Sequence, residues 1–252
     1  MIRLEKASLK IKDKTILNPV SCQFEIGKMH LILGPNGAGK STLIKLMSRE
    51  TTPSSGKIYL NEKDLKQYSP LQLAKFRAVL SQNIELSFPM LTNQVVMMGR
   101  YPHFGNKPTA QDTQICEQAM QLFDVFTLSN RNYQTLSGGE KQRVQFARVF
   151  AQIWQTQTEQ PRLLLLDEPL TFLDIYYQYS LMQKMKDFMQ QNPDLTVIGV
   201  VHDLSIATKF AHQTLLVKNS SIFAQGNPDA VLSKNNILEV FGVKIKQYLE
   251  LE

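Results

Sequence analysis

The sequence has 252 residues, of which 43% are hydrophobic and 20% charged, a composition that is ordinary for a globular protein and excludes a fibrous or disordered chain. The formal net charge of +6 is modest and no dense Lys/Arg tract accompanies it, so nucleic acid is not an expected partner. No apolar run reaches the roughly 20 residues that cross a bilayer, and the N-terminus lacks the apolar core of a secretory signal, which predicts a cytoplasmic protein.

The N-terminal quarter predicts strands, a glycine-rich turn and a helix. Residues Ile2–Phe24 mix alternating apolar positions with turn residues, which indicates short strands. Met29–Leu33 predicts a short buried strand that leads directly into a glycine-rich turn. Ser41–Arg49 then has the apolar spacing of a helix, and after a turn Lys57–Leu60 alternates like a further strand.

The middle of the chain, from about 83 to 155, is rich in Gln and Met and predicts a mainly helical lobe. Helical spacing is clearest in Thr113–Phe126 and Gly138–Ile153. Strand character returns in the apolar runs Arg162–Leu166 and Thr196–Val201, which are separated by the helical segment Tyr176–Gln191. This alternation predicts an α/β fold with a parallel sheet into which the helical lobe is inserted.

Two cysteines, Cys22 and Cys116, lie far apart and in no metal-like spacing. Neither a disulfide framework nor a zinc site is expected, and a reducing compartment fits. We interpret both as small buried apolar side chains.

The strongest motif is a glycine-rich segment between a predicted strand and a predicted helix. It reads Gly34-Pro35-Asn36-Gly37-Ala38-Gly39-Lys40-Ser41 and is followed by Thr42. Glycines let backbone N–H groups close around phosphate oxygens, and the start of the helix adds a favourable dipole. Lys40 can reach the β- and γ-phosphates and the Ser41 hydroxyl can bind Mg²⁺. A chance glycine-rich turn is the alternative, but the strand–helix context favours a site for ATP and Mg²⁺.

A second motif is a pair of carboxylates, Asp167 and Glu168, that follows the apolar run Leu163–Leu166. Acids at the end of a buried strand are costly unless an ion or a reaction uses them. Asp167 suits the outer shell of Mg²⁺, and Glu168 can orient or polarise an attacking water. The alternative is a strand that ends in a solvated acidic turn, which the phosphate motif upstream disfavours.

A third motif, Leu136–Arg143, lies at the start of a predicted helix. Ser137 is a good N-cap, and Glu140 three residues later completes a capping box, which is a sufficient structural explanation of these two residues. The pair Gly138 and Gly139 stays unexplained, because glycine weakens a helix. Their presence is reasonable if the backbone N–H groups must approach another phosphate.

Together these three segments resemble the ATP-binding subunit of ABC transporters. The resemblance spans about Leu4 to Gly226, and Leu136–Arg143 is the element that separates this family from other P-loop ATPases. It implies a single ABC ATPase domain over residues 1–252, with a P-loop core, a mainly parallel sheet and an N-terminal antiparallel β subdomain. The helical subdomain inserted at about 83–155 would carry the signature segment.

The resemblance also implies roles for single residues. Gln82 is similar to the glutamine that contacts Mg²⁺ and the attacking water and links the site to a membrane subunit. Asp174 resembles the aspartate that crosses the interface between two copies, and His202 resembles the switch histidine at the γ-phosphate. A lone histidine at a strand end is usually structural, so the inference for His202 depends on its place after the two acids.

In this family two copies enclose two nucleotides. The resemblance therefore implies that the signature residues of one copy act on ATP held by Lys40 of the other; these residues are Ser137, Gly138, Gly139 and Glu140. Many members stack adenine on an aromatic side chain, but Ser8–Lys12 contains none. Ile11 or Leu9 could supply an apolar platform, and the preference for ATP over GTP stays open.

The segment from Leu86–Pro89 through Val95–His103 is similar to ATPases of iron-siderophore, cobalamin and haem importers. The spacing from Ser137 to Asp167 is longer than in sugar-importer ATPases, and together these two features most resemble the ATPases of haem importers. The resemblance implies a motor that energises haem import, bound to two membrane permeases at the cytoplasmic face of the inner membrane and indirectly to a periplasmic substrate-binding protein. Siderophore or cobalamin import is the alternative, and a soluble ABC ATPase outside transport is a further one. A non-hydrolytic nucleotide-binding module is disfavoured by Glu168.

Two features of the helical lobe have plain structural interpretations. Arg100–His103 is expected to be a turn at a helix end with His103 exposed to solvent, rather than a haem ligand. The methionines Met90, Met97 and Met98 are expected to be core residues. Alternatively, this surface receives a short helix of the membrane subunit.

Overall fold

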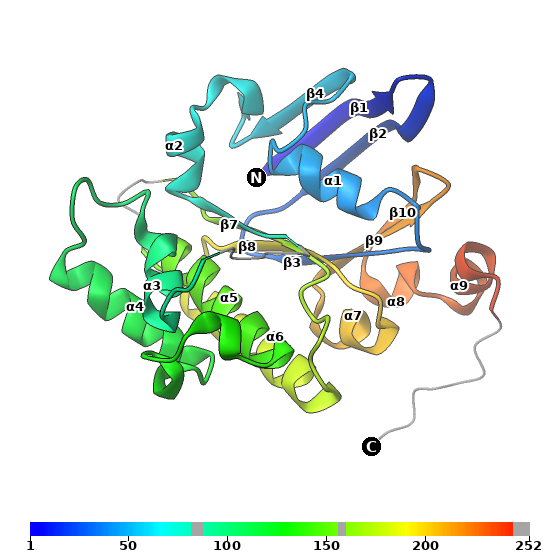
Figure 1. Ribbon diagram of the computed structural model, residues 1–252. Helices are drawn as coiled ribbons and strands as arrows, with labels where there is room; N and C mark the ends of the chain where they lie inside the picture. Colours follow the sequence, from blue (N-terminus) through cyan, green and yellow to red (C-terminus); the bar gives the residue numbers. More distant parts are fainter. Residues whose placement is uncertain (82–87, 156–159, 244–252) are drawn as a thin grey trace. The chain divides into compact units, whose positions relative to one another are not determined.

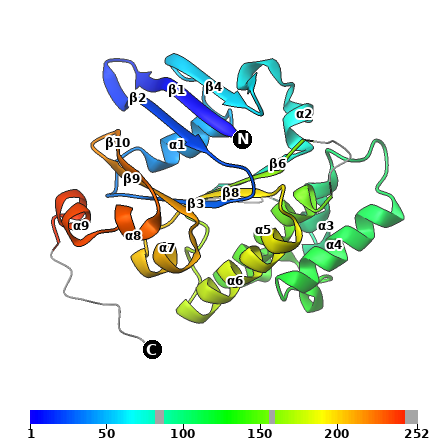
Figure 2. The same cartoon turned by 180° about the vertical axis from the view of Figure 1, so that it is seen from behind.

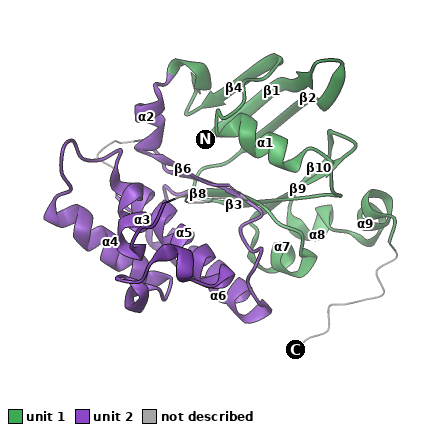
Figure 3. Ribbon diagram, viewed as in Figure 1, with its two compact units in different colours: residues 1–67, 196–252 green, residues 68–195 purple. Residues whose placement is uncertain are grey.

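The computed structural model describes residues 1–81, 88–155 and 160–243 of the chain. These form two compact units, one built from residues 1–67 and 196–252 and the other from residues 68–195 (Figure 3). We call them unit 1 and unit 2 and describe each by itself. No described helix is both long and apolar enough to cross a membrane.

Unit 1 contains an antiparallel sheet with the strand order β2-β1-β4-β5. Its strands are β1 (Ile2–Ile11), β2 (Lys14–Phe24), β4 (Ser55–Leu60) and β5 (Lys63–Asp64). The first two strands are longer than the short strands expected from the sequence, and register shifts interrupt their pairing between Leu4 and Lys10. Alternate residues of this sheet enter the core, among them Ile2 and Leu4. This sheet is antiparallel, as expected for an N-terminal β subdomain.

The second set of strands in unit 1 has the order β10-β9-β3-β8, in which β3 pairs in parallel with β8 and β9. The strands are β3 (Met29–Leu33), β8 (Thr196–Val200), β9 (Gln213–Lys218) and β10 (Ser221–Gly226). Every residue of β3 and β8 is buried, which explains why both strands are apolar apart from His30 and Thr196. The helices are α1 (Lys40–Met47), α7 (Leu204–Phe210), α8 (Pro228–Val231) and α9 (Lys234–Phe241). Helix α1 lies on one face of β3, and α7 lies on the other (Figures 1 and 2).

Unit 2 is mainly helical around two parallel strands, β6 (Arg77–Leu80) and β7 (Leu163–Asp167). Its helices are α2 (Pro70–Ala74), α3 (Thr92–Met97), α4 (Ala110–Leu122), α5 (Gly138–Ile153) and α6 (Ile175–Gln191). A single 3₁₀ turn, Met98–Arg100, follows α3, and another, Phe126–Leu128, follows α4. A third, Tyr133–Thr135, precedes α5. The core of this unit includes contacting aromatic rings, namely Phe123, Phe146, Phe150 and Phe188.

The strand expected at Arg162–Leu166 begins one residue later, at Leu163. Arg162 instead forms hydrogen bonds to residues outside the strand. Arg162 is 6% exposed, and its guanidinium forms two hydrogen bonds to the Asp194 carboxylate. It also donates to Asn192 Oδ1 and to the carbonyls of Ile153 and Trp154. Arg162 therefore joins the C-terminal ends of α5 and α6 to the start of β7.

Both cysteines are buried thiols, as expected from the sequence. Burial raises the pKa of the Cys22 thiol and of the Cys116 thiol to about 12, because a thiolate would lose its hydration there. Both side chains are therefore neutral at physiological pH.

Candidate functional site

The glycine-rich loop of unit 1 joins the buried strand β3 to helix α1. Gly34, the first residue after β3, has φ +152°, and a Cβ built on it would lie 2.1 Å from the carbonyl oxygen of Val217 in β9. Gly37 and Gly39 have φ +75° and +101°, in the left-handed region that favours glycine. The backbone of this loop therefore favours glycine at all three positions, and packing requires it at Gly34, independently of any ligand.

Lys40 is wrapped by this loop. Its Nζ donates hydrogen bonds to the carbonyl oxygens of Gly34 and Pro35, both at 2.9 Å, and the residue is 5% exposed. Gly39 is the N-cap of α1 and offers no side chain to the first-turn N–H groups of that helix. Ser41 and Thr42 in this first turn are half-buried. A held ammonium group beside a helix start without a capping side chain fits a polyphosphate.

His202 belongs to unit 1 and follows β8 at the same edge as the glycine-rich loop. The N–H of Val201 donates to Ile32 O at 3.1 Å, which holds this segment beside the end of β3. His202 itself is exposed, and Asp203 next to it caps α7 by accepting from the N–H groups of Ser205 and Ile206. The predicted strand Thr196–Val201 thus ends at Val200, with His202 two residues beyond.

The two candidates for an apolar base platform differ in accessibility. Leu9 is 7% exposed and belongs to the core, so its interpretation as a platform is wrong. Ile11 is 57% exposed at the end of β1. A Cβ on Gly39 would lie 3.1 Å from Leu17 Cδ1, which places β2 next to the glycine-rich loop. Ile11 therefore remains as the aliphatic candidate.

The carboxylates of unit 2 lie where β7 ends. Asp167 is the last residue of the strand and is 6% exposed. Glu168 has φ +50°, which is unusual for a residue with a Cβ. The Thr171 hydroxyl donates to Glu168 O at 2.9 Å and closes a turn there. The strand thus ends with one buried acid, and the half-buried Glu168 follows it in a left-handed conformation.

The signature segment begins α5 with the expected capping box. Ser137 Oγ accepts from the N–H of Glu140, and Glu140 Oε2 accepts from the N–H of Ser137 at 2.8 Å. The hydrogen bonds from Ser137 lower the pKa of the Glu140 carboxyl. A Cβ on Gly138 or Gly139 would meet its nearest neighbours at 3.5 Å, ordinary van der Waals contact. Packing within the chain therefore does not require glycine at either position.

The loop from Glu168 to Asp174 carries contacts that sequence reasoning missed. Gln142 Nε2 donates to Pro169 O at 2.6 Å, and Gln178 Nε2 donates to Leu173 O at 2.9 Å. Asp174 caps α6 by accepting from the N–H of Tyr177. Gln142 is part of the signature segment, but nothing in the spacing of the two motifs indicated which residue of the loop it would contact. Gln82, predicted to contact Mg²⁺ and water, lies outside the described residues.

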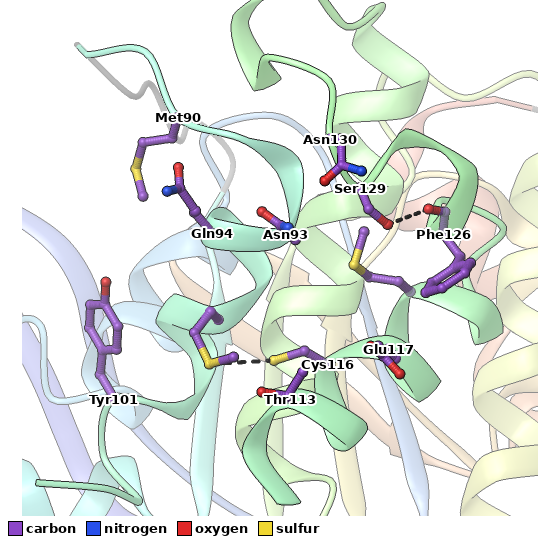
Figure 4. Close-up of a pocket in the computed structure, with 12 residues that line it drawn as sticks. Met90, Asn93, Gln94, Tyr101, Thr113, Cys116, Glu117, Phe126, Ser129 and Asn130 are labelled. Carbon is purple, nitrogen blue, oxygen red and sulfur yellow. Dashed lines mark hydrogen bonds between the residues drawn. The ribbon is translucent and has the colours of Figure 1, made fainter. Parts of the chain in front are cut away.

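A hollow of about 570 Å³ lies between α3 and α4 in unit 2 (Figure 4). Its lining includes four sulfur-containing side chains, two rings and one carboxylate: Met90, Met97, Met120, Cys116, Tyr101, Phe126 and Glu117. The sulfur atoms of Cys116 and Met97 are 3.9 Å apart. Met90, Met97 and Met98 are half-buried, so their interpretation as core residues is wrong. The flexible side chains of Met90 and Met97 line the hollow instead.

The expectation of an exposed His103 is also wrong. His103 is half-buried, and its Nε2 lies 2.7 Å from Gln152 O. Burial and the nearby Arg100 lower the pKa of His103. Arg100 is itself buried, where it donates to Asp112 Oδ1 and to Ala151 O. The segment forms a turn after a short helix, as expected, but its polar side chains fasten it to α4 and α5.

Comparison with known proteins places this geometry in context. The ABC transporter family model matches residues 17–171. A hemin import ATP-binding protein, HmuV, from Gloeobacter violaceus is 38% identical over 244 residues, which cover 97% of this chain and 88% of that protein.

Two solved structures extend this comparison. One, described as an inward-facing ABC transporter of the metal-chelate type, has a TM-score of 0.80 and 25% identity and covers 99% of this chain and 94% of that one. A dimeric ATP-binding cassette, MJ0796 bound to ADP and Pi, shares the fold with a TM-score of 0.78 at 20% identity, covering 90% and 99% of the two chains.

Proposed function

We propose that this chain hydrolyses ATP to drive the import of hemin. The chain belongs to the ABC transporter family and is an ATP-binding subunit of that family. The glycine-rich loop of unit 1, Gly34–Ser41, carries this proposal, and we call it the phosphate loop. Three glycines at positive φ hold the loop around Lys40, and the uncapped start of α1 follows it. This arrangement binds a polyphosphate through backbone N–H groups and one ammonium group.

In the proposed reaction, water attacks the γ-phosphorus of ATP as the bond to the ADP oxygen breaks. Glu168, which follows β7, orients the attacking water or accepts its proton. His202 contacts the γ-phosphate. Lys40 neutralises charge on the β- and γ-phosphates. We assign Gln82 to the same water on the resemblance alone.

Residues with hard oxygen donors would hold Mg²⁺, namely Ser41 and Asp167 with Gln82. These donors fit the preference of Mg²⁺ for hydroxyl, carboxylate and amide oxygens. When bound, the ion neutralises charge on the phosphates. Neither Ser41 nor Asp167 is a soft ligand, so the set favours Mg²⁺ over Zn²⁺.

We further propose that two copies of the chain enclose two ATP molecules. Gly138 and Gly139 support this, because packing within the chain leaves room for a Cβ at both positions. The start of α5, with Ser137 and Glu140, would bind the γ-phosphate of ATP held by the partner copy, and Asp174 would lie at the interface between the copies. Nucleotide would thus close the dimer.

Hemin is favoured over ferric siderophores and cobalamin as the transported substrate, because the relative that is 38% identical and covers 97% of this chain is a hemin import protein.

Ile11 supports the base of the nucleotide by aliphatic contact, and without ring stacking the preference for ATP over GTP should be weak. Two membrane permeases would bind this subunit and keep it at the cytoplasmic face of the inner membrane.

The hollow between α3 and α4 is the surface we assign to the permease. A short helix with an apolar face fits a groove lined by adaptable methionine side chains. Glu117 on its wall would accept a basic residue of that helix. Met97→Glu should therefore reduce copurification with the permease.

The test measures ATP hydrolysis and hemin uptake in vesicles that contain the chain with its permeases. Glu168→Gln should retain ATP binding and lower turnover by about a thousandfold or more, because an amide cannot accept the water proton. Retained turnover would contradict the role of Glu168. Uptake of a ferric siderophore or cobalamin in place of hemin would change the substrate and leave the ATPase intact.

A further inference from the structure

The loop that carries Glu168 is fastened to the signature helix of the same chain. We call residues 168–174 the carboxylate loop. Gln142 of α5 donates from Nε2 to Pro169 O at 2.6 Å, directly next to Glu168 in the chain. Four residues earlier on α5, a Cβ on Gly138 would lie 3.5–4.0 Å from the side chain of Phe172. Since positions i and i+4 share one face of a helix, one face of α5 contacts both ends of this loop.

The conformation of the carboxylate loop depends on its surroundings. Glu168 and Phe172 have φ +50° and +69°, although neither is glycine. Such conformations persist where neighbouring contacts hold them. The hydroxyl of Thr171 holds Glu168 O from within the loop, and Gln142 holds the next carbonyl from outside it. A shift of α5 would therefore alter the direction in which Glu168 points.

Helix α5 extends from the signature residues past Gln142 without interruption, from Gly138 to Ile153. Its N-cap Ser137 is exposed, and Gln142 lies in the second turn. The two positions belong to one rigid element, so a displacement at the cap moves the amide of Gln142 as well.

We propose that Gln142 is a positioning residue that couples the two ATP sites of the dimer. It acts through Pro169 on the orientation of Glu168. This inference rests on the proposed function, in which α5 of each copy binds the partner's nucleotide while Glu168 serves the nucleotide of its own copy. Binding of the partner's ATP at Ser137 aligns α5, and Gln142 transmits that alignment to the base. Each site thus hydrolyses fastest when the other is filled.

A second side chain, Gln178, also forms hydrogen bonds to the carboxylate loop. It allows the proposed coupling to be distinguished from a general loss of support for the loop. Gln178 of α6 donates from Nε2 to Leu173 O at 2.9 Å and to Leu170 O at 3.5 Å. This contact supports the same loop from a helix that does not begin at the signature. Its removal should loosen the loop without interrupting the path from α5.

The test measures kcat, KM and the Hill coefficient for ATP, together with the melting temperature, on the purified full chain. Gln142→Met keeps the length and removes the donor, so kcat should fall about tenfold with KM changed less than about twofold. The Hill coefficient should fall from its native value, between 1 and 2 for two sites, to about 1. Gln142→Lys, which restores a long donor, should recover part of both.

Two matched variants complete the design. Gln183→Met alters a surface glutamine of α6 that bonds Asp187, and it should leave kcat and the Hill coefficient at native values. Gln178→Met should lower kcat and keep the native Hill coefficient.

A Hill coefficient of 1 for the native chain would overturn the proposal, and so would an unchanged Hill coefficient in Gln142→Met. A fall of the Hill coefficient in Gln178→Met equal to that in Gln142→Met would overturn it as well. In each of these cases Glu168→Gln still abolishes turnover and the proposed function stands. If the native chain did not hydrolyse ATP in the presence of its permeases, both the proposed function and the role of Gln142 would be contradicted.

Discussion

Gly34 in the phosphate loop and Gly138 in the signature segment both precede or begin a helix, yet their surroundings differ. A Cβ on Gly34 would lie 2.1 Å from a backbone oxygen of Val217, whereas a Cβ on Gly138 would meet Phe172 at 3.5 Å. Gly34 also has a φ of +152°, which other residues rarely adopt. The phosphate loop therefore needs its glycine in order to fold, and the signature segment does not.

The difference separates two ways of building a nucleotide site. Unit 1 forms its cradle from its own strands, because β9 presses against the turn that follows β3. The start of α5 in unit 2 is capped by Ser137 within the chain, and a Cβ at either of its glycines would make only ordinary van der Waals contacts. A feature that the chain does not need for itself is best explained by something that approaches from outside, which we propose is the partner's nucleotide.

Gly34→Ala should have the largest effect on stability. The added methyl group would overlap the Val217 carbonyl and would sit at an unfavourable φ, so we expect a loss of about 4 kcal/mol in the free energy of unfolding. Urea denaturation followed by circular dichroism measures it. A loss below about 1 kcal/mol would show that the loop can relax and would remove the contrast with Gly138.

The buried strand that leads into the phosphate loop predicts a pH dependence of stability. His30 of β3 is 1% exposed and packs edge-on against the ring of Phe24. Burial lowers the pKa of His30 from 6.5 to about 4, because the charged imidazolium is disfavoured there. Below pH 6.5 the unfolded chain therefore takes up a proton that the folded chain does not.

Stability should thus be fully present above pH 6.5 and fall by about 2 to 3 kcal/mol between pH 6.5 and 4.5, as calculated from the two pKa values. Below pH 4 this contribution levels off. Thermal unfolding across this range measures the slope, and His30→Gln is the matched variant because its amide is neutral throughout. An equal slope in His30→Gln would assign the acid sensitivity to other groups.

The sequence predicted the phosphate loop and α5 well because each is determined by local chemistry. Glycines at fixed spacing after an apolar run define the loop, and Ser137 with Glu140 defines the helix start. The apolar runs of β3 and β8 likewise predicted strands that are buried along their whole length.

Contacts between residues distant in the chain could not be predicted in the same way. Arg162 was placed in a strand, but its donors reach Asp194 and the end of α5. Leu9 was a possible platform for the base, and the sheet register turns it into the core while Ile11 stays exposed. His103 was expected in solvent, and the fold brings Gln152 O to its ring. Such pairings depend on tertiary structure, which periodicity does not encode.

Mixing two inactive variants would sharpen the proposed role of the signature. Lys40→Ala removes the phosphate contact and Ser137→Arg blocks the signature, so each variant alone should be inactive. A mixed dimer contains one site with both parts intact. Random pairing makes about half of the dimers mixed, and each mixed dimer has one intact site, so an equal mixture should recover up to about a quarter of native ATP turnover. The proposed coupling lowers this value, because the second site of a mixed dimer lacks Lys40. No recovery above the single variants would contradict action across the dimer.

Gly138→Ala should have the smallest effect on stability and still lower activity. The methyl group finds ordinary contact distances beside Phe172, and alanine favours a helix over glycine, so the free energy of unfolding should stay the same or rise by up to about 1 kcal/mol. Turnover should fall because the methyl group occupies space that the partner's phosphate needs. Gly105→Ala is the matched control, since a Cβ there meets nothing within 4 Å. Gly105→Ala should retain native turnover. If Gly138→Ala also retained native turnover, the room beside Gly138 would have no function and the two glycines would differ in packing alone.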